Sequence, residues 1–118
     1  MTINRESIRK IDFKGITTGK RLPAVHPGEV LLKEFIEPLG LTRYKVAKAI
    51  KVQQRRVDEI CSGKRAITAD TALRLAKLFG VDAQTWMNLQ AQYDLETAER
   101  ESSKRIDREV TPLPRAAA

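Results

Sequence analysis

The chain has 118 residues and carries 22 Lys/Arg against 15 Asp/Glu, a formal net charge of +7. That length corresponds to one domain with a single modest core, and the positive balance favours a polyanionic partner. A single cysteine excludes an internal disulfide, no apolar run approaches the roughly 18 residues that a membrane span needs, and the N-terminus lacks a signal-peptide core. We therefore expect a cytoplasmic protein with no membrane partner.

Residues 1–25 are predicted to form a flexible basic arm. Up to residue 26 the chain holds six Lys/Arg and two acids, and its apolar residues follow no sustained period. Gly15 and Gly19 interrupt the pattern further. This composition is typical of a segment that stays unfolded alone or folds on a partner.

Residues 26–98 are predicted to form an all-α domain of five helices. The first helix begins at Pro27, because proline suits the first helical position, and it closes by Gly40. The fourth follows Thr68, a residue that caps helices well, and ends at Gly80.

The second and third helices, within residues 42–65, are joined by a tight turn and followed by a basic loop. At 100° per residue, Arg55 and Glu59 of the third helix lie opposite an apolar face. That face consists of Val57, Ile60 and Cys61. The turn carries Lys51 where glycine is usual, so a lysine must adopt the backbone conformation that glycine adopts more easily.

An exposed helix that opens with glutamines and arginines can enter a major groove, because Gln pairs with adenine and Arg with guanine through two hydrogen bonds each. In a helix-turn-helix the preceding helix crosses the DNA backbone, and cations after the second helix can hold phosphates. Residues 42–65 contain eight Lys/Arg and two acids. The candidate DNA-binding residues are Arg43, Gln53, Gln54, Arg55, Arg56, Glu59, Lys64 and Arg65. An ordinary solvated helical hairpin remains the alternative interpretation.

The fifth helix begins near Asp82 and carries a stripe at helical spacing. The stripe consists of Trp86, Leu89 and Tyr93. Such a stripe usually packs in a core, although part of it could form a dimer seam. Residues 99–118 are predicted to be the end of this helix and a frayed tail, because the closing stretch loses periodicity and gains prolines.

No motif predicts an enzyme, a metal site or a cofactor. The sequence has no Gly-rich phosphate loop, no cluster of metal ligands, and no Ser/His/Asp or Cys/His set with plausible spacing. His26 is the single histidine and is expected at the entry to the first helix. Cys61 is expected to pack in the core.

Three stretches resemble the HigA family of antitoxins, a branch of the lambda-repressor-like helix-turn-helix proteins. They are HPGEVL (26–31), GKRAITADTALRLAKLFG (63–80) and WMNLQAQYDLETA (86–98). The resemblance implies a five-helix domain that dimerises, represses its own operon and neutralises a co-encoded HigB-type toxin that cleaves messenger RNA. A dimer of this kind binds operator DNA as an inverted repeat. The positions that match the DNA-reading helix are Gln53, Gln54, Arg55, Arg56 and Glu59.

Two surfaces are candidates for docking the toxin. An enzyme that cleaves RNA presents a basic surface, which four acids near the C-terminus would match by charge. These are Asp94, Glu96, Glu99 and Glu101. The arm instead offers apolar anchors that salt does not screen, and we favour it. Its candidate toxin-binding residues are Ile8, Ile11, Phe13 and Ile16.

Two other functions stay open. One is a stand-alone or phage-type repressor without a toxin, which a neighbouring gene for a small basic protein would argue against. The other is a protein-interaction module whose helix-turn-helix no longer binds DNA. The concentrated positive charge around Arg55 and Lys64 argues against that second alternative.

Overall fold

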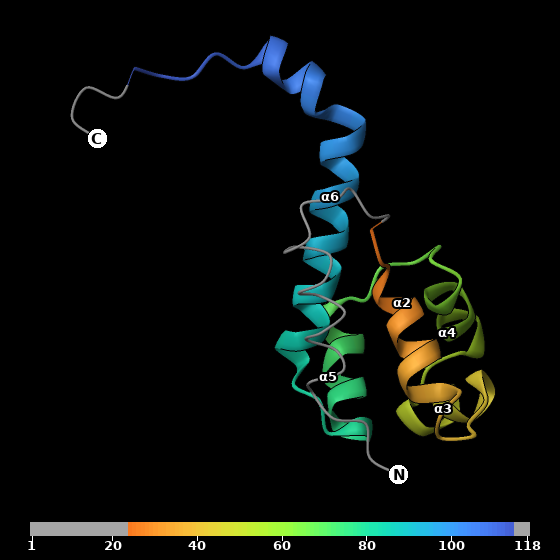
Figure 1. The fold of residues 1–118 in the computed structure, drawn as a ribbon. Coiled ribbons are helices and arrows are strands. Elements are labelled where there is room, and N and C mark those ends of the chain that lie inside the picture. Colours follow the sequence, from red (N-terminus) through yellow and green to blue (C-terminus); the bar gives the residue numbers. More distant parts are fainter. Residues whose placement is uncertain (1–23, 115–118) are drawn as a thin grey trace.

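The structure is a computed structural model, and it describes residues 24–114. The candidate toxin-binding residues Ile8, Ile11, Phe13 and Ile16 lie outside the described residues. Within 24–114 every regular element is a helix (Figure 1). In chain order these are α2 (Pro27–Val30), η1 (Leu31–Ile36), α3 (Arg43–Ile50), α4 (Gln54–Cys61), α5 (Ala69–Phe79) and α6 (Ala83–Glu109). The all-α class and the five predicted helices are confirmed, since α2 and η1 together form the first.

The first helix changes its hydrogen-bond register after one turn. From Leu31 to Ile36 it is a π-helix, and the Glu37 N–H donates to the Leu32 carbonyl at 2.9 Å. Pro38 has no N–H and cannot continue an α-helical ladder, while the wider turn lets the neighbours Phe35 and Ile36 both be buried. The sequence predicted this helix but not its π register.

The helices pack in pairs around one core. The α3 helix lies against α4, and α5 lies against both α3 and α6. Trp86 is fully buried, and its ring centroid lies 5.2 Å from that of Phe35. Leu89 is also buried in this core. Trp86 and Leu89 of the stripe on α6 are therefore core packing within one chain.

The entry to α2 packs very closely on the end of α4. A Cβ atom at Gly28 would overlap the Ile60 carbonyl oxygen, so this position requires glycine. His26 Nδ1 accepts a hydrogen bond from the Gly28 N–H at 2.9 Å, and its ring meets Tyr93 edge-on at 4.8 Å. Burial lowers the pKa of His26, although Asp94 and Glu29 oppose that shift. The predicted place of His26 at the helix entry is confirmed.

The last helix is longer than the sequence predicted. It continues to Glu109, so it is about 40 Å long at ~1.5 Å per residue. Its second half extends past the other helices (Figure 1). The prediction of a frayed tail was wrong for residues 102–109, because neither Gly nor Pro interrupts residues 83–109 and an Arg105–Glu109 ion pair at 3.9 Å supports the last turns. Residues 110–114 form no helix.

Candidate nucleic-acid interface

The helix-turn-helix is built from α3, α4 and the turn between them. Thr42 caps α3, since its Oγ1 accepts a hydrogen bond from the Lys45 N–H at 3.0 Å. The helix ends at Lys51, which has a left-handed backbone with φ 63°. It is the one non-glycine residue with positive φ within residues 24–114. The expectation that lysine adopts the conformation usual for glycine is therefore confirmed.

The α4 helix has the two faces that the sequence predicted. Val57, Ile60 and Cys61 are buried, whereas the Arg55 side chain on the opposite face is 81% exposed. Gln53 caps the helix through its backbone, so its side chain is not engaged in the cap. Burial raises the pKa of the Cys61 thiol to about 11, which makes it a neutral core residue as expected.

A single carboxylate ties the exposed face of α4 to the loop that follows. Glu59 Oε2 lies 3.2 Å from Arg55 Nε, and Glu59 Oε1 lies 3.0 Å from Arg65 Nε. The two arginines come from opposite sides of Glu59 in the sequence and share one anion. The Glu59 side chain is 28% exposed, so water screens this pairing less than it would a fully exposed pair.

The backbone holds the basic loop against the end of α4. Gly63 has φ 80°, which turns the chain, and the N–H groups of Lys64 and Arg65 donate to the Glu59 carbonyl at 2.8 and 3.2 Å. The loop therefore folds back on the last turn of α4. Lys64 forms no ion pair within the described part of the chain.

The sequence did not identify the residue that anchors the far end of this loop. Gln90 is buried on the core face of α6, and its Oε1 accepts a hydrogen bond from the Ile67 N–H at 2.8 Å. Its Nε2 donates to Asp94 Oδ1 at 2.9 Å. The sequence did contain a signal for this role. Gln90 stands one turn after Trp86 on the same face of the helix, and a buried amide needs hydrogen-bond partners.

Arg43, at the start of α3, pairs with a residue of α4. Its Nε is 3.3 Å from Asp58 Oδ1, and the contact is an ion pair whose geometry falls short of a hydrogen bond. About half of the Arg43 side chain is exposed. This arginine can therefore reach a partner that approaches the exposed face of α4.

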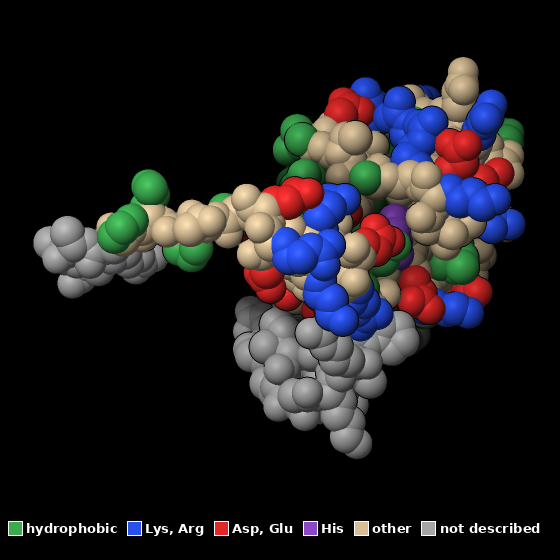
Figure 2. All heavy atoms as spheres, turned by 90° about the horizontal axis from the view of Figure 1, so that it is seen from above, with side chains coloured by type: hydrophobic (Ala, Val, Ile, Leu, Met, Phe, Trp, Pro, Cys, Tyr) green, Lys and Arg blue, Asp and Glu red, His purple; other side chains and the backbone are tan. Residues whose placement is uncertain are grey.

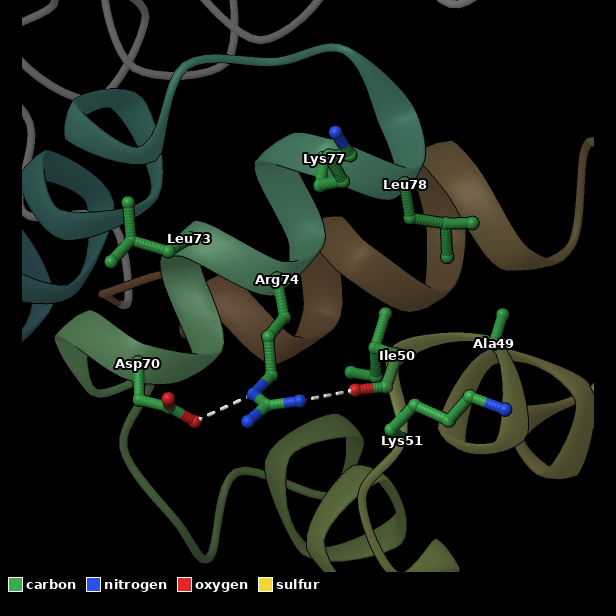
Figure 3. Close-up of a pocket in the computed structure, with 8 residues that line it drawn as sticks. All are labelled: Ala49, Ile50, Lys51, Asp70, Leu73, Arg74, Lys77 and Leu78. Carbon is green, nitrogen blue, oxygen red and sulfur yellow. Dashed lines mark hydrogen bonds and ion pairs between the residues drawn. The ribbon is translucent and has the colours of Figure 1, made fainter.

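Arg56 lies at the edge of the surface and contacts α5. Its Nη1 is 3.4 Å from Asp70 Oδ2, which also accepts a hydrogen bond from Arg74 Nε at 2.8 Å. Figure 3 shows Arg74 between Asp70 and the Ile50 carbonyl, to which it donates at 2.8 Å. The hydrogen bond from Arg74, together with the charges of Arg74 and Arg56, holds the pKa of Asp70 below its usual value. This network fixes α5 to the residue before Lys51 and so supports the turn.

The predicted site residues lie on or beside α4: ion pairs join Glu59 to Arg55 and Arg65, and Arg43 pairs with Asp58 of the same helix. We call this part of the surface the basic face; it is formed by Arg43, Gln53, Gln54, Arg55, Glu59, Lys64 and Arg65. Arg56 is drawn toward α5 at its edge. An exposed helix flanked by cations, with acids that fix the direction of the arginines, has the shape and the charge to meet a polyanion along a groove.

Comparison with known proteins supports this chemistry. The helix-turn-helix family model matches residues 32–86. Virulence-associated protein I of Dichelobacter nodosus is 51% identical over 87 residues, which is 73% of this chain and 81% of that protein.

Two solved structures share the fold. An addiction module antidote protein of the HigA family from Coxiella burnetii is 43% identical with a TM-score of 0.74, over 78% of this chain and 100% of that one. The antitoxin HigA of Pseudomonas aeruginosa, solved with the higBA promoter, is 41% identical with a TM-score of 0.75, over 77% and 99% of the two chains. Identity at this level over whole relatives shows the family: the chain belongs to the HigA antitoxins with a helix-turn-helix fold.

Proposed function

We propose that this protein binds operator DNA as a homodimer, represses its own operon and neutralises a co-encoded HigB-type toxin. The observation that carries the DNA-binding part is the basic face, with Arg55 exposed at its centre and paired to Glu59. The HigA relative in Pseudomonas aeruginosa was solved with its promoter, which supports the same use of the fold here.

In this proposal α4 enters the major groove. Gln53, Gln54 and Arg55 lie at its first turn and read base edges, while Glu59 directs Arg55 and can accept a hydrogen bond from a cytosine amino group. The remaining cations hold phosphates on either side of the groove and set the register of the protein on the duplex. These cations are Arg43, Lys64 and Arg65, with Arg56 at the edge.

The inverted repeat follows from symmetry. Two copies related by a two-fold axis present two α4 helices, so the half-sites lie about one helical turn, or a multiple of it, apart. Neutralisation of the toxin is supported by membership of the antitoxin family. We assign toxin docking to the arm of residues 1–25, whose apolar residues Ile8, Ile11, Phe13 and Ile16 suit a segment that folds on binding.

The test is to express the chain alone and together with the product of the adjacent gene. We expect the pair to co-purify, the adjacent protein to stop growth when expressed alone, and the chain to bind DNA from upstream of its own gene more tightly than random DNA. Upstream DNA binding with a harmless, non-binding neighbour would instead indicate a stand-alone repressor. Equal affinity for upstream and random DNA would overturn the DNA-binding role.

A further inference from the structure

Large apolar side chains are exposed in two groups within residues 24–114, apart from the single residues Val25 and Tyr44. One group follows the second half of α6 and the segment after it, which stands clear of the body in Figure 2. The other group consists of Leu73 and Leu78 on α5, which are 64% and 39% exposed. These two leucines border a groove, so they differ from the isolated apolar residues that any protein surface carries.

The groove lies between α5 and the end of α3 (Figure 3). We call it the α5 groove; its volume is about 520 Å³, and the residues that line it are those labelled in Figure 3. The lining residues from α5 stand at positions 70, 73, 74, 77 and 78, which is the spacing of a single helix face. Thr71, Ala72 and Leu75 form the opposite, buried face of the same helix. The α5 helix therefore has one face in the core and a second face, with two leucines, on the groove.

The charges that line the α5 groove are mainly positive. Lys51, Arg74 and Lys77 line it together with one acid, Asp70, a net of 3 − 1 = +2. Asp70 is already engaged, since it pairs with Arg74 at 2.8 Å and with Arg56 of α4 at 3.4 Å. Lys51 and Lys77 are exposed and form no ion pair within the described part of the chain. The groove thus presents two ammonium groups beside two exposed leucines.

The floor of the groove is held in place before any partner binds. Arg74 is fixed from two sides, because its Nε donates to Asp70 Oδ2 at 2.8 Å and its Nη1 donates to the Ile50 carbonyl at 2.8 Å. Ile50 itself is buried. A surface whose residues are already fixed loses little conformational freedom on binding, which favours association.

We propose that the α5 groove binds an acidic amphipathic segment of another protein. Apolar side chains of that segment pack on Leu73 and Leu78, and its carboxylates pair with Lys51 and Lys77. An amphipathic helix laid into a groove is a recurring mode of peptide recognition. This partner is distinct from the operator DNA and from the toxin held by the arm, so the inference goes beyond the proposed function.

Charge argues against the occupants that the molecule itself could supply. Two copies joined through this groove by a two-fold axis would set Lys51 and Lys77 against the same lysines. The chain up to residue 26 carries six Lys/Arg and two acids, so the groove repels the arm. A phosphate backbone could reach the lysines but has no apolar side chain to cover Leu73 and Leu78. An acidic segment with apolar side chains matches both features of the groove.

The first experiment uses three fluorescent synthetic peptides of about twelve residues, or ~18 Å as a helix. The test peptide has leucines spaced along one helix face and Asp or Glu at most other positions. One comparison peptide replaces the acids with Lys, and the other replaces the leucines with Ala. Fluorescence anisotropy with the full chain at about 150 mM salt should show at least about tenfold tighter binding of the test peptide than of either comparison peptide.

The second experiment locates the test peptide on the protein. Leu73→Ala and Lys77→Ala should each weaken its binding by about three- to tenfold, because each removes one of the two kinds of contact. Leu113→Ala and Lys64→Ala are the matched controls, since they remove an exposed leucine after α6 and an exposed cation of the basic face. Both controls should bind the peptide within about twofold of the wild-type chain. Thermal melting followed by circular dichroism checks that every variant is folded.

Equal affinity for the three peptides, or unchanged binding in Leu73→Ala and Lys77→Ala, would overturn the inference. Loss of binding in Lys64→Ala but not in Lys77→Ala would place the peptide on the basic face and would overturn it as well. Operator binding is measured in separate titrations, so the α5 groove and the proposed function can fail independently.

Two further measurements identify the other possible occupants. If Ile11→Ala together with Phe13→Ala in the full chain raised the affinity for the test peptide, the arm would be the occupant. If light scattering gave a lower solution mass for Leu73→Ala than for the wild-type chain, a second copy would be the occupant. Either result would overturn the assignment of the groove to another protein, whereas unchanged affinity and mass support it.

Discussion

Glu59 Oε1 lies 3.0 Å from Arg65 Nε, across the junction between α4 and the loop that follows it. The other oxygen of the same carboxylate holds Arg55 at 3.2 Å. An arginine proposed to read a base and an arginine proposed to hold a phosphate are thus oriented by one acid. Such pairing restricts the directions in which the arginines point before any partner arrives, and it lowers the positive charge of the face.

Replacing Glu59 with Gln should therefore affect specificity more than affinity. Glu59→Gln frees both arginines and removes a negative charge from the basic face. Affinity for random DNA should therefore rise by about two- to tenfold, and the ratio of operator affinity to random-DNA affinity should fall. Fluorescence anisotropy with operator and scrambled duplexes measures both constants. Glu37→Gln is the control, because it makes the same charge change beside Lys33, away from the basic face. An unchanged ratio of operator to random affinity would contradict the role of Glu59.

Two cations on the basic face should respond differently to truncation. Arg55→Ala should cost roughly 1–3 kcal/mol of operator binding and relax the preference at one base step. Lys64→Ala should weaken binding to all sequences alike and reduce the slope of log K against log salt by about 1. Titrations at several salt concentrations, on the operator and on its single-base variants, separate these effects. If both variants changed only the salt slope, α4 would not be the base-reading helix.

Local sequence patterns predicted the helix-turn-helix but not the long-range hydrogen bonds that hold it in place. The cap at Thr68 and the apolar face around Ile60 act within a few residues, so their pattern predicted the elements correctly. Gln90 and Arg74 act on residues 23 and 24 positions away, and no local pattern indicates such partners. The same holds for the π register of η1, which depends on tertiary burial of adjacent residues.

Because Lys51 has a left-handed backbone, replacing it with glycine should stabilise the protein. Lys51→Gly should raise the free energy of unfolding by about 0.5–1 kcal/mol, because glycine adopts φ near 63° without a Cβ clash. Lys48→Gly, within α3, should instead lower it by about 1 kcal/mol. Urea unfolding followed by circular dichroism compares the two. Destabilisation by Lys51→Gly would mean that the lysine side chain makes a contact that outweighs the strain.

Removal of residues 1–22 should separate toxin binding from the rest of the molecule. We expect the truncated chain to fold, dimerise and bind DNA but to fail to rescue cells that express the toxin. The physical reason is that the apolar anchors Ile8, Ile11, Phe13 and Ile16 would be lost while the described helices stay intact. Growth after toxin induction, with and without the truncated chain, is the readout. Full rescue would assign docking to the acids of α6, and then Glu96 and Glu99 would be the residues to replace.

Stability should depend on pH through His26, the single histidine of the chain. Burial lowers its pKa in the folded state below the ordinary value of 6.5, so the unfolded chain takes up the proton first as the pH falls. The free energy of unfolding is therefore at its full value above pH 6.5, the ordinary pKa of histidine. It decreases as the pH falls below that value, by at most about 1.4 kcal/mol per pH unit. The lowered pKa of Asp70 acts in the same direction but only at lower pH, near its ordinary value of 3.8.

Urea unfolding at about pH 7.5 and about pH 5.5 measures the loss. His26→Asn is the matched variant, because Asn can still accept the hydrogen bond from the Gly28 N–H but does not titrate, and its stability should be level over the same range. An equal loss in both chains would show that another group carries the pH dependence.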